Sequence, residues 1–152
     1  MPDAARCIGT ETIDGIGRTS YTRVMGHFHV LADLTGPTGV IQSVELLVDT
    51  GATFLTVPRV VAERLALKPN RIVSIQVAGG TKEHWPLANV RLALGDDEII
   101  TPCLIVPDGA ALLGAVPLES LLLAVDPVGK RLVPTDGYAM ASTSRAGVAV
   151  LA

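Results

Sequence analysis

The alternation of apolar and polar residues predicts that most of the chain forms short β-strands. In the first half, residues 21–32 are rich in Met, Phe, Val and Leu and are expected to form a strand, and a second strand is expected over 40–48. Between them, Gly-Pro-Thr-Gly at 36–39 has the residue types of a tight turn. These two strands are therefore predicted to pair as a hairpin.

A second hairpin is predicted in the middle of the chain. Residues 71–77 and 83–94 are both expected to be extended, and the segment Ala78-Gly79-Gly80-Thr81 that joins them is rich in glycine. The acidic segment 95–98 that follows is interpreted as a charged turn without chemistry. Taken alone, such a hairpin would be a plain surface feature.

Two prolines mark short helices, and the remaining strands lie around them. Pro58 and Pro117 are each expected to open a helix, because proline is well tolerated in the first helical turn. Further strands are predicted at 101–106 and 111–114, and the segment 123–134 has the form of a closing hairpin. The pattern as a whole predicts a mostly β fold with one or two short helices.

The same pattern divides the chain into one folded unit with two flanking segments. Residues 1–20 show no periodicity and are expected to form a loose or extended leader. Residues 21–134 form the expected domain, and residues 135–152 are expected to be a flexible tail. We find no internal repeat, so the expected domain has one lobe.

Composition and charge exclude some classes of partner. Hydrophobic residues make up 49% of the 152 residues and charged residues 18%, which suggests apolar surface that a partner covers. A net charge of -3 without a basic stripe argues against nucleic acid as a ligand. The most apolar region, 110–125, is short and interrupted by Pro117, so no membrane span is expected.

Cysteine and histidine usage argues against disulfides and metals. Cys7 and Cys103 are too few for a disulfide framework and stand in no Cys-x-x-Cys pattern. The first residues lack the pattern of a signal peptide, so a reducing, cytoplasmic location is expected. His27 and His29 share one face of a strand, but they have no third ligand nearby, and we expect neither a metal nor another cofactor.

The strongest chemical signal is the acid that ends the strand over 40–48. Asp49 follows an apolar run directly, and Thr50, Gly51 and Ala52 come after it. Glycine lets the backbone turn sharply and approach another group closely, which leaves the carboxylate accessible where the interior meets solvent. The alternative is that Asp49 only tightens a turn, since Asp, Thr and Gly are common turn residues.

This loop, together with a later apolar segment that ends in Gly114, resembles the site of the retropepsin-like aspartic proteases. From residue 25 to 134 the order of features is similar to that family, and the segment 118–134 is similar to its stand-alone bacterial members. The resemblance implies a single-lobe acid protease fold with a closed, β-barrel-like sheet. It implies a catalytic Asp49, a supporting loop of Thr50, Gly51 and Ala52, a substrate-binding flap of Ala78, Gly79, Gly80 and Thr81, and packing under the site by Leu112, Leu113 and Gly114.

One carboxylate does not complete such a site. Hydrolysis by this route needs one carboxylate as base and a protonated partner as acid, and two carboxylates held close together share a proton, as is known of aspartic proteases as a class. The chain has one Asp-Thr-Gly, and Asp126, which precedes Pro127, lacks small polar neighbours. We therefore expect a homodimer in which each chain supplies Asp49, acting on an extended peptide or an unfolded protein.

The resemblance has one departure. Viral members follow their apolar-apolar-Gly segment with an arginine and an acid or amide, whereas this chain has Ala115-Val116-Pro117. The dimer contacts of the viral proteins are therefore not expected here. Two other functions remain open, a catalytically weak peptide-binding or dimerisation module with this fold, and a metal-dependent hydrolase.

Overall fold

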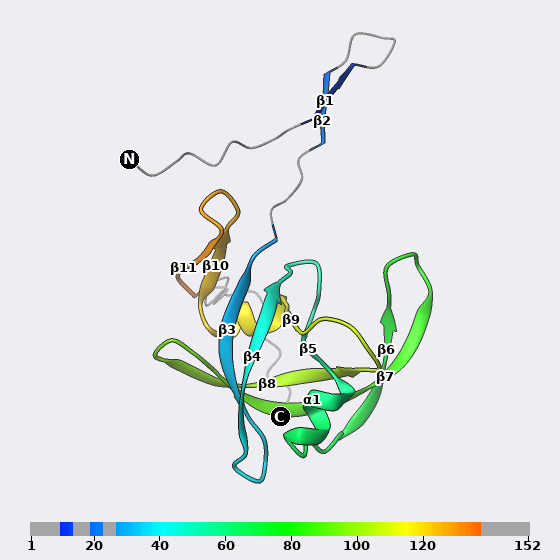
Figure 1. Cartoon of the computed structure of the whole chain (residues 1–152), viewed down its shortest axis with the longest axis vertical. Helices are drawn as coiled ribbons and strands as arrows, with labels where there is room; N and C mark the ends of the chain where they lie inside the picture. Colours follow the sequence, from blue (N-terminus) through cyan, green and yellow to red (C-terminus); the bar gives the residue numbers. More distant parts are fainter. Residues whose placement is uncertain (1–9, 14–18, 23–26, 138–152) are drawn as a thin grey trace, which may run out of the picture.

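One seven-stranded sheet dominates the structure, a computed structural model that describes residues 10–13, 19–22 and 27–137 (Figure 1). The strand order is β3-β4-β9-β5-β8-β7-β6, and β3 also pairs with β7, so the sheet curls back on itself in a barrel-like way. Its strands are β3 (His29–Thr35), β4 (Ile41–Val48), β5 (Leu55–Pro58), β6 (Arg71–Gln76), β7 (Lys82–Leu94), β8 (Asp97–Val106) and β9 (Leu112–Leu113). The prediction of a mostly β, single-lobe fold is confirmed.

The first hairpin of this sheet joins β3 to β4. The two strands pair antiparallel from His29↔Leu47 to Thr35↔Ile41, and the Gly36 N–H closes the turn by donating to the Val40 carbonyl at 2.9 Å. Every second residue points into the core, as the alternating pattern predicts. The predicted start at residue 21 was wrong for this strand, because its pairing with β4 begins at His29 and extends past residue 32 to Thr35.

Two parallel pairings bring distant parts of the chain together. β9 lies parallel to the end of β4, and β5 lies parallel to the end of β8. β9 also pairs antiparallel with β5 through Thr56↔Leu112. The segments before and after the Asp49 loop are therefore tied to a third segment more than fifty residues later.

The middle of the chain forms the second hairpin, β6–β7, which continues into β8. β6 pairs antiparallel with β7 from Gln76↔Lys82 to Arg71↔Leu87, and β7 pairs with β8 along its length. The predicted charged turn over 95–98 was too long. Asp97 pairs with Leu94 and Glu98 with Ala93, so the turn narrows to Gly95 and Asp96, where Gly95 takes a φ of 61° that suits glycine.

The two predicted helices are present and short. α1 (Arg59–Arg64) follows Pro58, which is its extended N-cap residue. α2 (Ala115–Ser120) begins two residues before the predicted Pro117, because Gly114 already provides its extended N-cap. Within the described residues, neither helix has the length or apolar character needed to cross a bilayer.

The buried apolar side chains form two clusters. The larger one fills the inside of the curled sheet and includes residues from β3, β4, β5, β7, β8 and both helices. The smaller one lies between the β6–β7 hairpin and β8, where Leu87, Leu104 and Val106 are buried and Trp85 packs against them. The hairpin is thus anchored at its base by side chains next to the Asp49 loop.

Two short strand pairs stand apart from the main sheet. β1 (Thr10–Ile13) pairs with β2 (Thr19–Thr22) within and just beyond the segment expected to be a loose leader. β10 (Leu123–Asp126) pairs with β11 (Arg131–Pro134), which confirms the closing hairpin. Residues 138–152, most of the expected tail, lie outside the described residues, as do residues 1–9, 14–18 and 23–26.

Candidate active site

Asp49 lies at the end of β4, where a buried strand leaves the core. The Asp49 N–H donates to the Leu113 carbonyl at 3.0 Å, so the last residue pairing of the strand fixes the position of the acid. Its carboxylate Oδ1 accepts a 2.9 Å hydrogen bond from the Gly51 N–H, and the Ala52 N–H donates to the Asp49 carbonyl at 3.2 Å. The loop thus folds tightly around a half-buried carboxylate.

The apolar segment that ends in Gly114 holds this loop from the other side. β9 places Leu112 and Leu113 beside Leu47 and Val48 at the end of β4. A Cβ at Gly114 would collide with the carbonyl oxygens of Ala52 and Phe54, so the backbones approach more closely there than any other residue allows.

The start of α2 adds two further hydrogen bonds to the loop. The Ala115 N–H donates to the Ala52 carbonyl at 2.8 Å, and the Val116 N–H donates to the Thr53 carbonyl at 2.9 Å. The first N–H groups of a helix have no partner within the helix and are free to bind elsewhere. Main-chain donors at the start of α2 therefore help to hold the Asp49 loop in place.

One buried hydroxyl was not foreseen from the sequence. Thr56 is buried, and its Oγ1 accepts a 3.1 Å hydrogen bond from the Leu112 N–H. This bond fixes β9 to β5 at the point where their pairing is a single residue pair. No local pattern marks Thr56, because its partner lies 56 residues away in the sequence.

The Asp49 loop and the β6–β7 hairpin enclose a cavity of about 720 Å³, which we call the Asp49 cavity. The loop contributes Asp49, Gly51 and Ala52 to the lining, whereas Thr50 is exposed and does not line it. Five large apolar side chains are also part of the lining. These are Phe54, Ile75, Trp85, Leu104 and Leu112.

The hairpin tip forms the opposite wall of this cavity. Ala78, Gly79 and Gly80 line it, and Thr81 closes the turn by accepting a 2.9 Å hydrogen bond from the Val77 N–H. Gly79 and Gly80 have φ values of 99° and 86°, which side chains resist. The sequence predicted this tip from its two glycines, and the structure brings it to the same cavity as Asp49.

Asp49 is the single acid among the described residues that line the Asp49 cavity. Asp126 is engaged elsewhere. Its carboxylate accepts hydrogen bonds from the Gly129 and Val128 N–H groups and pairs with Arg131 at 3.2 Å. The Gly129 N–H, followed by Arg131, lowers the pKa of Asp126 below its ordinary value. Asp126 thus stabilises the turn of its own hairpin.

No metal-binding cluster of three or more His, Cys, Asp or Glu occurs in the part of the chain that the structure describes. His27, which precedes β3, and His29, which begins it, are both exposed. Cys103 is free and fully buried, and burial raises the pKa of its thiol to about 12, which keeps it protonated at neutral pH.

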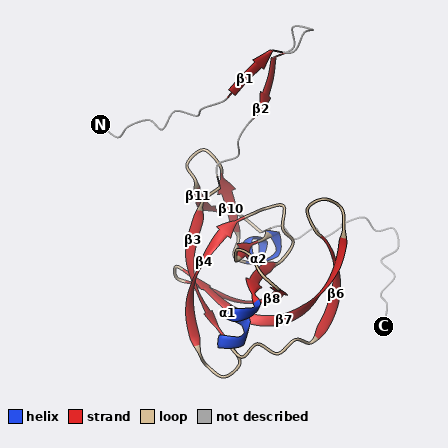
Figure 2. Ribbon diagram, turned by 45° about the vertical axis from the view of Figure 1, so that its right-hand side comes forward, coloured by secondary structure: helices blue, strands red, loops and turns tan. Residues whose placement is uncertain are grey.

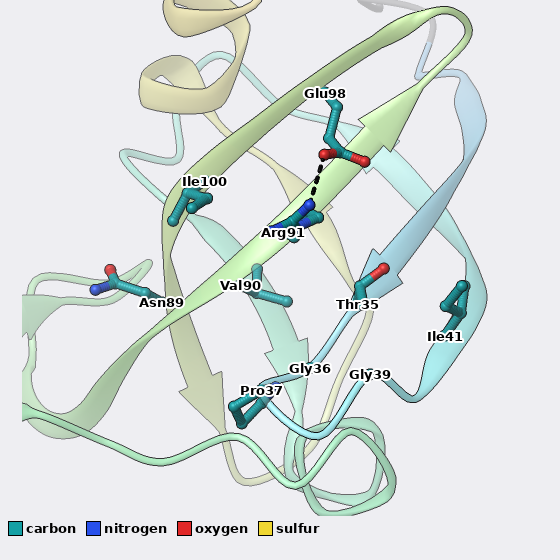
Figure 3. A pocket seen from close by; sticks show the side chains of 10 residues that line it. All are labelled: Thr35, Gly36, Pro37, Gly39, Ile41, Asn89, Val90, Arg91, Glu98 and Ile100. Atoms are coloured by element: carbon teal, nitrogen blue, oxygen red, sulfur yellow. Dashed lines mark hydrogen bonds and ion pairs between the residues drawn. The ribbon is translucent and has the colours of Figure 1, made fainter.

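A second cavity, of about 550 Å³, lies at the far end of β4 (Figure 3). Its lining includes Ile41 and Ile100, both largely exposed, and the pair formed by Arg91 and Glu98, whose side-chain atoms approach to 2.9 Å. We call it the Arg91–Glu98 cavity. Its one carboxylate is neutralised by a guanidinium group, so we assign it no catalytic chemistry.

Comparison with known proteins agrees with this geometry. A family model described as aspartyl protease matches residues 30–122, more than half of the chain and all of the loop, hairpin and β9 segments. No curated protein matches the chain.

Two viral proteases are among the solved structures that this chain is similar to. The EIAV protease complexed with the inhibitor HBY-793 is 20% identical, with a TM-score of 0.52 over 75% of this chain and 98% of the viral chain. The simian foamy virus (mac) protease is 17% identical, with a TM-score of 0.46 over 62% of this chain and 94% of the viral one. The first likeness supports a retropepsin-like fold, and the family match shows that the chain belongs to the aspartyl protease family.

Proposed function

We propose that the protein is an aspartic endopeptidase whose active site forms between two copies of the chain, each supplying Asp49. The observation that carries the proposal is the single carboxylate in the Asp49 cavity, held at the end of a buried strand by backbone hydrogen bonds. Two such carboxylates side by side cannot both ionise easily, so one keeps a proton. A lone Asp49 has no such partner.

The chemistry follows from this pairing. The ionised Asp49 takes a proton from a water molecule as the water attacks the peptide carbonyl, and the protonated Asp49 of the other copy donates to the carbonyl oxygen. The first Asp49 then gives the proton taken from water to the leaving amine as the carbon–nitrogen bond breaks, and the second Asp49 takes back a proton from a hydroxyl of the tetrahedral intermediate, which becomes the new carboxylic acid. Gly51 and Ala52 keep the space beside the carboxylate free of side-chain bulk, and Thr50 is proposed to link the two loops through its hydroxyl.

The substrate is proposed to be an extended peptide or a segment of an unfolded protein. The Asp49 cavity lies between a loop and a hairpin tip whose backbones both carry glycine, so a peptide backbone can approach closely from either side. Main-chain hydrogen bonds to an added strand would orient the scissile bond. Closing Gly79 and Gly80 over that strand would exclude water from the reacting groups.

The expected setting is the cytoplasm. The sequence contains only two cysteines, and Cys103 is free and buried, so no disulfide that involves it supports the fold.

A mixing experiment tests both the role of Asp49 and the two-chain site. Parent protein is co-refolded with increasing amounts of the Asp49→Asn variant, and the rate on an unstructured peptide is measured at constant parent concentration. If both copies contribute Asp49, mixed dimers are inactive and the rate falls as variant chains capture parent chains. A cleavage rate that stays constant as the variant is added would show that one chain is sufficient for catalysis. Absence of cleavage by the parent over a wide pH range would favour the peptide-binding module.

A further inference from the structure

One wall of the Asp49 cavity is formed by three adjacent strands, β9, β5 and β8. Thr56 on β5 pairs with Leu112 of β9 and with Leu104 of β8, and all three residues line the cavity. Figure 1 shows β9 and β5 between β4 and the β6–β7 hairpin, and in the turned view of Figure 2 this hairpin again lies on the other side of the domain from β4. Thr56 therefore belongs to the middle strand of this wall.

Thr56 is a polar side chain among apolar neighbours. Among the described residues that line the Asp49 cavity, it is the one polar residue that is buried, with 6% of its surface exposed. Leu55 and Val57 belong to the main core, whereas Phe54 and Thr56 line the cavity, as the alternation of side chains along a strand requires. Valine has the shape of threonine and carries no polar atom, so a buried threonine here needs a partner for its hydroxyl.

The Thr56 hydroxyl has only part of its hydrogen-bonding capacity in use. Its Oγ1 accepts the 3.1 Å hydrogen bond from the Leu112 N–H. A hydroxyl can accept two hydrogen bonds and donate one. Within the part of the chain that the structure describes, the Thr56 hydroxyl donates no hydrogen bond. The contact with β9 therefore leaves a buried donor for a group that enters the cavity.

The distance between Thr56 and Asp49 decides which part of a substrate Thr56 meets. β5 is two strands away from β4 in the sheet, and neighbouring strands are about 4.8 Å apart, so Thr56 lies about 10 Å from the strand that ends at Asp49. Successive residues of an extended peptide are about 3.3 Å apart, so this separation corresponds to about three residues. Thr56 is thus placed to contact a side chain near the scissile bond and not the bond itself.

We infer that Thr56 determines specificity by donating a hydrogen bond to the hydroxyl oxygen of a substrate side chain, an inference that rests on the proposed endopeptidase function. Threonine in the substrate fits this position, because its carbon atoms contact Leu104 and Leu112 while its oxygen accepts from Thr56. Valine in the substrate has the same shape but no acceptor, so its binding leaves the Thr56 donor desolvated and unpaired. A cavity lined mainly by large apolar side chains then selects a hydroxyl at one position of the peptide.

Paired peptides test the inference. Unstructured peptides carry threonine or valine at each position within about four residues of the scissile bond, which spans the separation estimated above. The quantity measured at each position is kcat/KM for the threonine peptide divided by kcat/KM for the valine peptide. In the Thr56→Val variant this ratio should fall about 10-fold at the position that contacts Thr56, because the donor is lost and an apolar partner is gained.

Two variants serve as controls for this ratio. Thr56→Ser keeps the hydroxyl and should keep the ratio of the parent within about twofold, since the hydrogen bond remains. Thr101→Val removes a hydroxyl that is 1% exposed and does not line the cavity, so it should also leave the ratio unchanged. A purely structural role of Thr56 in holding β9 would lower both rates together and would not move their ratio.

Peptide binding gives a second measurement that needs no Thr56 variant. With the Asp49→Asn variant, the Kd of each peptide is measured by fluorescence anisotropy. The threonine peptide should bind at least as tightly as the valine peptide at the position that contacts Thr56, whereas valine should bind more tightly where only apolar side chains are met. Tighter binding of the valine peptide at every position would overturn the inference even where Thr56→Val did not fold.

The outcomes separate the inference from the proposed function. Cleavage with the same ratio in the parent and in Thr56→Val at every position overturns the role of Thr56 and leaves the protease proposal standing. A protein that binds the peptides with a preference that depends on Thr56, but never cleaves them, supports the Thr56 contact and overturns the protease proposal. A protein that neither binds nor cleaves them overturns both.

Discussion

The two ends of β4 carry cavities of similar size and very different chemistry. At one end, the Asp49 cavity of about 720 Å³ holds a carboxylate bonded only to backbone N–H, beside glycines of a loop and a hairpin. At the other, the Arg91–Glu98 cavity of about 550 Å³ holds a carboxylate paired with a guanidinium on an open sheet face. The volume of a cavity is therefore a poor indicator of reactivity. The hydrogen-bond and ion-pair partners of its carboxylate are a better one.

The backbone differs between the two ends as well. The Asp49 loop is held by hydrogen bonds from β9 and α2 and by a glycine contact that no side chain could replace. The turn at 36–39 beside the other cavity has its own close contact, since a Cβ at Gly36 would collide with the Leu65 carbonyl oxygen, but this contact holds no acid in place. A catalytic side chain needs to be held by several independent contacts, because small displacements of the reacting groups greatly lower the reaction rate.

The largest expected effect separates the two carboxylates. Asp49→Asn should lower the rate of peptide cleavage by at least about 1,000-fold, since an amide cannot exchange the proton. Glu98→Gln, the matched change at the other end of β4, should leave the rate within about twofold, because an exposed ion pair stabilises little. Initial rates on one unstructured peptide measure both. Substantial activity in the Asp49→Asn variant would show that Asp49 is not the catalytic acid.

The second prediction compares one glycine from each end. Gly114→Ala should destabilise the fold by about 2–4 kcal/mol and displace the Asp49 loop, because the new Cβ meets two carbonyl oxygens with no room to move. Gly39→Ala should cost about 1 kcal/mol, since Gly39 has a φ of 86° but open space around it. Urea unfolding followed by circular dichroism compares the two, and equal losses would contradict the close approach at Gly114.

The third prediction separates flap motion from simple turn strain. Replacing Gly79 and Gly80 with valine should lower turnover by about 10-fold to 100-fold, because the hairpin tip could no longer close over a peptide. Gly95→Val is the control at the opposite end of β7, with a positive φ and open space. Both variants should lose some stability in a thermal melt, but only the first should lose turnover. Equal rates in the two would show that the tip is not a flap.

The parts of the site that are marked by the residue types next to them in the chain could be predicted from the sequence. Asp49 follows an apolar strand directly, and the hairpin tip carries two adjacent glycines, so each is marked by its own neighbours. The buried Thr56 and the parallel pairings of β9 with β4 and of β5 with β8 have no such mark, because they join segments far apart in the chain. Strand boundaries were missed for the same reason, since pairing partners decide where β3 and β8 begin.

The smallest expected effect concerns the Arg91–Glu98 pair itself. Both side chains are about half exposed, with relative exposures of 52%, so water competes for the charges and the long side chains lose freedom on pairing. A double-mutant cycle with Arg91→Gln and Glu98→Gln should give a coupling free energy below about 1 kcal/mol. Raising the salt concentration to about 1 M should reduce it further, because screening then acts within about 3 Å. The measurement is urea unfolding of the four proteins at low and high salt. A coupling of several kcal/mol that resists salt would mean that this end of β4 holds a desolvated charge pair, and the contrast with the Asp49 cavity would have to be drawn from the backbone alone.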